Sequence, residues 1–131
     1  MLHHIALGAQ DVEAVASFYI DVLGLELCKR HLKEDGSTRS IWLWLSDQSV
    51  LMIEHAEHPR PAPDGPVIAQ GPFLLAVSIE ESQRAPLLEK LETLGQTLEA
   101  STSFTSYFRD PEGNRVAVSA YPLEELRGKR S

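Results

Sequence analysis

The chain of 131 residues contains a single cysteine, Cys28, and little positive charge. One cysteine excludes an intrachain disulfide and is typical of a reducing compartment. The net charge of −7 disfavours nucleic-acid and anionic-membrane partners, because both attract clustered basic residues. No apolar run is long enough to span a membrane, and the start Met-Leu-His-His lacks the regions of a signal peptide. We therefore expect a cytoplasmic protein.

Several catalytic signatures are also missing. The sequence has no glycine-rich phosphate loop, no Gly-x-Ser-x-Gly elbow and no nucleophile–base pair that spacing reveals. We interpret Cys28 as a buried spacer, since nothing near it in the sequence would stabilise a thiolate. With 43% hydrophobic and 24% charged residues, the chain is typical of one globular domain that buries its own core.

The sequence contains two similar halves, which align when Ala6 is placed on Ala76. In each half a short apolar run precedes an acidic helix start and a Leu-Gly helix end, at Asp11 and Leu23-Gly24 and then at Glu81 and Leu94-Gly95. The repeat spans half the chain, so it indicates one domain built from two modules rather than a solenoid. The alignment places His4 of the first half on Leu74 of the second.

Hydrophobic periodicity predicts a βαβββ order in each half and an α+β fold class. Module one spans about residues 1–57, with strands near 2–8, 25–32, 39–45 and 49–55. Module two spans about 71–121, with strands near 73–79, 96–100, 105–109 and 114–121. A proline-rich linker covers 58–70, and a short C-terminal tail follows module two. We expect a single domain over residues 1–131.

Side chains alternate between the two faces of a strand, so one face of each predicted sheet packs on a helix and the other is open. His4 and Glu54 lie on the open face of module one, where small neighbours leave room for a ligand. The candidate ligand-binding residues are His4, Trp42, Trp44, Tyr107, Arg109 and Arg115. The tryptophans can stack on a flat ligand or serve ordinary packing. The arginines can clamp an anion, or Arg109 can support the adjacent turn.

Three segments together resemble a known family. They are His4-Ile-Ala-Leu, the helix with Ser17-Phe18-Tyr19 and Val22-Leu23-Gly24-Leu25, and the turn Phe108-Arg109-Asp110-Pro111-Glu112-Gly113-Asn114. The chain resembles the vicinal oxygen chelate superfamily, which includes glyoxalase I, fosfomycin-resistance thiol transferases, ring-cleaving dioxygenases and bleomycin-resistance proteins. The resemblance implies paired βαβββ modules that form an open, curled mixed sheet around a cavity, usually completed in a homodimer.

The resemblance also implies where a divalent metal would bind. Family enzymes hold it with residues of the first, fourth, fifth and eighth strands, typically His, Glu, His and Glu in glyoxalase I-like members. Those positions fall on His4 and Glu54, which match, and on Leu74 and Ala117, which do not. We expect the modules to superpose with Glu54 near Ala117. Replacement donors would have to come from His3, Cys28, His31, His55, Glu57 or His58.

Three functions remain open on this basis. The favoured one is a protein that sequesters a small organic molecule in the sheet cavity without a resident cofactor, because the metal set is incomplete. The second is a divalent-metal-dependent lyase, thiol transferase or dioxygenase in which Glu54 moves a proton. The third is a structural or interaction role, since a fold alone does not carry function.

Overall fold

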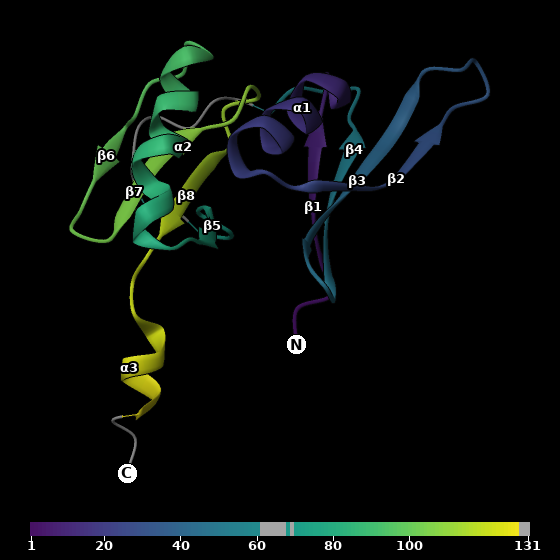
Figure 1. The fold of residues 1–131 in the computed structure, drawn as a ribbon. Helices are drawn as coiled ribbons and strands as arrows, with labels where there is room; N and C mark the ends of the chain where they lie inside the picture. The colour runs from purple at the N-terminus through teal and green to yellow at the C-terminus, as the bar shows by residue number, and fades with distance from the viewer. Residues whose placement is uncertain (61–67, 69, 129–131) are drawn as a thin grey trace. The chain divides into compact units, whose positions relative to one another are not determined.

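A computed structural model describes residues 1–60, 68 and 70–128. The chain forms two compact units (Figure 1). Unit 1 comprises Met1–Val67 together with Asp110–Gly113, and unit 2 comprises Ile68–Arg109 together with Asn114–Ser131. Each unit contains the βαβββ order that the repeat predicted, and unit 2 also contains a short C-terminal helix. Most of the predicted linker, residues 61–67 and 69, lies outside the described residues, and the single domain stays a prediction.

Unit 1 contains a mixed four-stranded sheet with the order β1-β4-β3-β2. Its elements are β1 (His4–Ala9), α1 (Val12–Leu23), β2 (Glu26–Leu32), β3 (Thr38–Ser46) and β4 (Ser49–His55). β1 runs parallel to β4, and the other pairs are antiparallel. Figure 1 shows that β2 and β3 form a long hairpin extending beyond α1.

Helix α1 begins and ends where its sequence signals predict. The Asp11 side chain accepts a hydrogen bond from the Ala14 N–H at 3.0 Å, which satisfies a free donor of the first turn. Gly24 ends the helix with φ of 69°, a conformation that favours glycine. The apolar stripe of α1 packs on β3 and β4. The most deeply buried apolar residues of those two strands are Ile41, Leu43, Leu51 and Ile53.

Unit 2 repeats the arrangement with the sheet order β5-β8-β7-β6. Its elements are β5 (Leu75–Ser78), α2 (Glu81–Thr93), β6 (Ala100–Ser101), β7 (Thr105–Arg109), β8 (Arg115–Ser119) and α3 (Leu123–Gly128). α2 buries Leu87 and Leu91, whereas α3 has no buried residue. Among the described residues no helix has the length and apolarity needed to cross a membrane.

The prediction of a strand at 96–100 was wrong, because the observed strand β6 is only two residues long, Ala100–Ser101. The residues before it complete the end of helix α2 instead. The Gln96 N–H donates to the Leu91 carbonyl at 3.0 Å, and Gly95 has φ of 75°. These contacts end the helix in a tight turn, so the chain straightens later than the apolar pattern indicates.

Candidate functional site

The open face of the unit 1 sheet carries three rows of side chains that the strand register aligns. The first row is His4, Val50, Trp44 and Glu26, the second is Ala6, Met52, Trp42 and Lys29, and the third is Gly8, Glu54, Ser40 and His31. Every candidate residue predicted for this face is therefore on it. The opposite face is the one that α1 covers.

The register separates His4 from Glu54. His4 pairs with Val50, and Glu54 pairs with Gly8, four residues further along both strands. At roughly 3.3 Å per residue the two positions lie about 13 Å apart along the sheet. The structure thus does not bring together the two residues that we predicted as one partial metal site.

The register of unit 2 corrects the predicted superposition. Ala117 pairs with Ala76, the residue that the repeat places on Ala6. Ala6 pairs with Met52, so Met52 rather than Glu54 is the unit 1 counterpart of Ala117. Leu74, which the repeat aligns with His4, directly precedes β5. The expectation that Glu54 superposes near Ala117 was wrong by two residues, which still leaves Glu54 on the same face.

These positions do not fit the family's metal. Of the four places that the repeat and register define, only His4 supplies a nitrogen or oxygen donor, since the others are Met52, Leu74 and Ala117. A catalytic metal of this kind needs about three protein ligands. Across the described ranges 1–60, 68 and 70–128, no three or more His, Cys, Asp or Glu residues form a group that can hold a metal.

The observed environments of His3, His55 and Cys28 do not supply the missing ligands. The Nδ1 atoms of His3 and His4 share a hydrogen bond of 2.9 Å on an exposed part of the chain. Lys33 Nζ lies 2.9 Å from His55 Nδ1, and donates to it when that nitrogen is unprotonated. Cys28 is a half-buried free thiol. None of these contacts assembles a ligand set around His4.

Two aromatic side chains of this open face lie close together. The rings of His31 and Trp42 lie 4.7 Å apart between centroids, tilted by 56°. Among the described residues, His31 Nε2 and Trp42 Nε1 are buried without a hydrogen-bond partner. Buried polar groups usually have a hydrogen-bond partner, so these two nitrogens stand out as donors or acceptors that the protein does not use. His31 was considered only as a spare metal ligand, and its role here depends on the β2–β3 register.

A cleft of about 490 Å³ lies at the end of the sheet where β2 begins and β3 ends. Trp44 stands in it with 41% of its surface exposed. The other lining residues come from the start of β2, the end of β3 and the adjoining turns, namely Gly24, Leu25, Glu26, Leu45, Ser46 and Asp47. Of the residues predicted to bind a ligand, Trp44 is the one that lines this cleft.

In unit 2, Arg109 and Arg115 are cross-strand partners that bind one carboxylate. Glu99 accepts from Arg109 Nε and Nη2, both at 3.1 Å, and from Arg115 Nη2 at 2.9 Å. The Arg109 hydrogen bond, reinforced by the charges of Arg109 and Arg115, lowers the pKa of Glu99. The Arg115 guanidinium also lies 4.8 Å from the centre of the Phe73 ring. The predicted anion clamp therefore already holds an internal anion.

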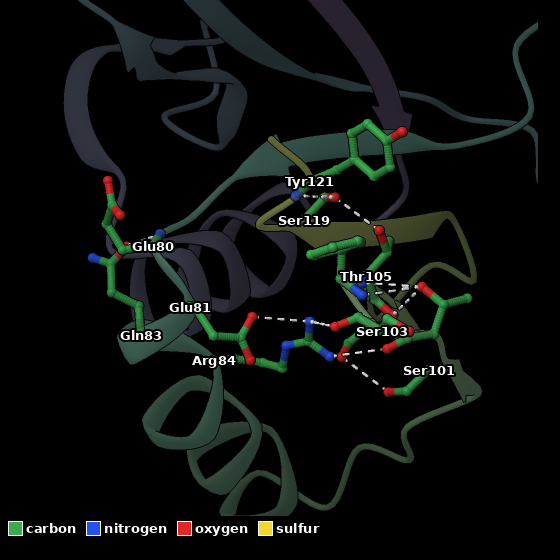
Figure 2. A network of polar contacts seen from close by, with 12 residues as sticks. Glu80, Glu81, Gln83, Arg84, Ser101, Ser103, Thr105, Ser119 and Tyr121 are labelled. Carbon is green, nitrogen blue, oxygen red and sulfur yellow. Dashed lines mark hydrogen bonds and ion pairs between the residues drawn. The ribbon is translucent and has the colours of Figure 1, made fainter. Parts of the chain in front are cut away.

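Tyr107 lies beside this cluster and pairs with Ala117 on the open face of unit 2. A second polar network of unit 2 connects α2 to the β6–β7 turn (Figure 2). Arg84 donates to the carbonyls of Thr102 at 3.1 Å and Ser103 at 2.8 Å, and pairs with Glu81 at 3.0 Å. Because these contacts are to backbone carbonyls and to its own helix, we interpret this network as structural.

The first four residues of the late turn predicted at 110–114, Asp110–Gly113, belong with unit 1. Its Asp110 carboxylate is buried and accepts a hydrogen bond from the Tyr19 hydroxyl at 2.9 Å. The Glu112 side chain accepts from the Gln10 N–H at 2.6 Å, next to the start of α1. Burial, and then the Asp110 charge and hydrogen bond, raise the pKa of Tyr19 far above its ordinary value. Sequence reasoning missed this pair, because 91 residues separate its members.

Solved structures share this fold. The genomically encoded fosfomycin resistance protein FosX from Listeria monocytogenes has a TM-score of 0.76 at 17% identity, covering 99% of this chain and 98% of that chain. A glyoxalase/dioxygenase from Nostoc punctiforme has a TM-score of 0.74 at 21% identity, covering 90% and 88%. A glyoxalase family protein from Enterococcus faecalis has a TM-score of 0.68 at 23% identity, covering 91% and 96%.

No curated protein sequence matches the chain. The family model described as Glyoxalase/Bleomycin resistance protein/Dioxygenase superfamily matches residues 1–118, which include both βαβββ modules. The predicted resemblance and the predicted α+β fold are thus confirmed. The chain belongs to the glyoxalase/bleomycin resistance protein/dioxygenase superfamily.

Proposed function

We propose that this protein binds a small organic molecule without a resident metal, on the open face of its β-sheet. The observation that carries the proposal is the donor set. Met52, Leu74 and Ala117 occupy three of the four positions that the repeat and register define, and His4 alone retains a donor. One imidazole is too few ligands for a catalytic metal.

The composition of the unit 1 face supports a ligand of organic character. Trp42, Trp44 and Met52 offer polarisable apolar surface, and Ala6 and Gly8 leave space beside them. His31 and Trp42 each bring a ring nitrogen without a protein partner. Satisfying such a group gives about 1–3 kcal/mol, so a ligand that reorients these rings gains polar contacts as well as apolar burial.

Two further features belong to the same proposal. Both sheets have edge strands, and family members usually assemble in pairs, so we expect a homodimer. The single Cys28 suits a reducing environment, so we keep the expectation of a cytoplasmic location.

Tryptophan fluorescence provides the test, because the chain's two tryptophans both lie on the unit 1 face. The purified protein is titrated with 8-anilinonaphthalene-1-sulfonate and with a panel of flat aromatic acids and amines, with and without EDTA. We expect saturable quenching that EDTA leaves unchanged. Metal analysis by mass spectrometry accompanies the titration, with less than stoichiometric manganese, nickel, zinc or iron expected.

Variants locate the binding. Trp42→Phe and Trp44→Phe each leave one reporter, and the matched control Leu123→Ala changes an exposed side chain of α3 in unit 2. Loss of quenching in a tryptophan variant, with none in the control, supports the proposal. Binding that appears only after a divalent metal is added would overturn it in favour of the metal-dependent alternative. If the protein binds none of the compounds, the result would overturn the proposal and favour the structural or interaction role.

A further inference from the structure

The cleft beside Trp44 combines features that favour a positively charged guest. Its volume of about 490 Å³ accommodates a small organic molecule. Trp44 is 41% exposed within it, although tryptophan is highly buried on average. Tryptophan is also the side chain that binds cations best through its ring face.

The charges around this ring are negative. Glu26 is the direct cross-strand partner of Trp44, so their β-carbons lie within about 5.5 Å. Asp47 follows β3 and lines the same cleft, and both carboxylates belong to exposed residues. Among the described residues, neither carboxylate forms an ion pair. A cation on the indole ring would therefore have two carboxylates near it.

The end of helix α1 adds to this polarity. Gly24, its C-terminal cap, lines the cleft, and the last turn of the helix has no basic residue. The C-terminal end of a helix carries partial negative charge and attracts cations. The protein's net charge of −7 acts in the same direction over longer distances.

The apolar part of the lining favours an organic cation over a metal ion. Leu25, which is 9% exposed, and the half-buried Leu45 line the cleft with Trp44, so part of its wall is hydrocarbon. Within the described part of the chain, no group of three or more metal-binding side chains lines the cleft. A hydrated metal would lose water here without replacement ligands, whereas an alkylammonium group buries its methyl groups on the same walls.

We propose that this cleft binds an organic ammonium ion, with its charge over the Trp44 ring and between Glu26 and Asp47. The inference rests on the proposed function, since it names a class of ligand for the same sheet face. A neutral flat molecule would use only the ring, so the carboxylates are what select for charge.

Choline and 3,3-dimethylbutan-1-ol form a suitable pair of probes, because they have nearly the same shape and differ in charge. Binding of each to the full chain is measured by ligand-observed NMR titration, at low and high salt. We expect choline to bind about tenfold more tightly than the alcohol, because only choline has a charge that the Trp44 ring and the two carboxylates attract. High salt should reduce the difference, because the carboxylates are exposed.

Three changes test the site. Trp44→Leu should weaken choline binding about tenfold, with the matched control Leu27→Ala, an exposed apolar residue of β2 outside the cleft. The double change Glu26→Gln and Asp47→Asn should remove the preference for choline, with Glu34→Gln in the β2–β3 turn as control. Circular dichroism of each variant verifies that it is folded.

The outcomes separate this inference from the proposed function. Equal binding of choline and the alcohol overturns the cation site while leaving small-molecule binding intact. The same holds if aromatic compounds quench the tryptophans and choline does not bind at all. A choline preference that survives both Trp44→Leu and the double carboxylate change also overturns it, because the cation would then bind elsewhere.

Discussion

The Tyr19 hydroxyl on helix α1 donates a buried hydrogen bond of 2.9 Å to Asp110, a residue 91 positions later in the chain. The Asp110 carboxylate also accepts from the Glu112 N–H at 2.9 Å. The early helix motif and the late turn motif, which together carried the family resemblance, are therefore parts of one hydrogen-bonded structure. Their sequence signature reports the architecture of unit 1 and does not by itself indicate an activity.

Removing the Tyr19 hydroxyl tests the contribution of this pair to stability. Tyr19→Phe keeps the buried ring and leaves the Asp110 carboxylate with one partner fewer, so the free energy of unfolding should fall by about 1.5–3 kcal/mol. Urea denaturation followed by circular dichroism measures the change. Tyr121→Phe is the matched control, because Tyr121 is 47% exposed. Equal losses in both variants would contradict a special role for the buried pair.

Burial of the Tyr19 hydroxyl, together with the charge and hydrogen bond of Asp110, should make stability sensitive to alkaline pH. The pKa of Tyr19 is raised by folding, so above its ordinary value of 10.0 the unfolded chain loses a proton that the folded protein keeps. This contribution to stability is complete below pH 10 and is lost as the pH rises further. The free energy of unfolding should fall less steeply between pH 10 and 11.5 in Tyr19→Phe than in the unchanged protein. Parallel slopes would rule out the linkage.

Glu99 should affect the acid side of the stability profile. The Arg109 hydrogen bond and the neighbouring arginine charges lower its pKa below the ordinary 4.5. Its contribution is therefore present above pH 4.5 and is lost as the pH falls through the lower value of the folded state. Glu99→Gln should flatten the dependence of the thermal midpoint on pH below 4.5. Glu92→Gln, on exposed helix surface, should retain the full dependence.

The strand register makes a specific prediction about metal ligands. With Met52 as the counterpart of Ala117, the changes Met52→Glu, Leu74→His and Ala117→Glu are all needed to give the family's four donors together with His4. The triple variant should bind nickel or zinc orders of magnitude more tightly than the double variant that lacks Met52→Glu, because each donor replaces a water. Isothermal titration of both variants measures this. Equal affinities would contradict the assignment of Met52 as the fourth ligand position.

Local sequence was sufficient for much of this fold. Asp11 and Gly24 mark the limits of α1 because capping depends on residues within one turn of the helix. The strand predicted at 49–55 is β4 as observed, and Trp42 and Trp44 lie opposite the buried Ile41 and Leu43, because alternation is a property of the strand itself. The two-module order followed from the repeat, since similar segments form similar elements.

Contacts between distant segments were decided only by the tertiary structure. The parallel pairing of β1 with β4 spans about 45 residues, and no local pattern specifies whether His4 lies beside Val50 or Glu54. A register shift of two residues keeps the same side chains on the same face, so alternation cannot detect it. The Tyr19–Asp110 hydrogen bond and the cross-strand pairing of Trp44 with Glu26 were not predictable either, because both join segments that are separate in the sequence. The sequence determined which side chains face outward, and the pairing of strands determined which of them are neighbours.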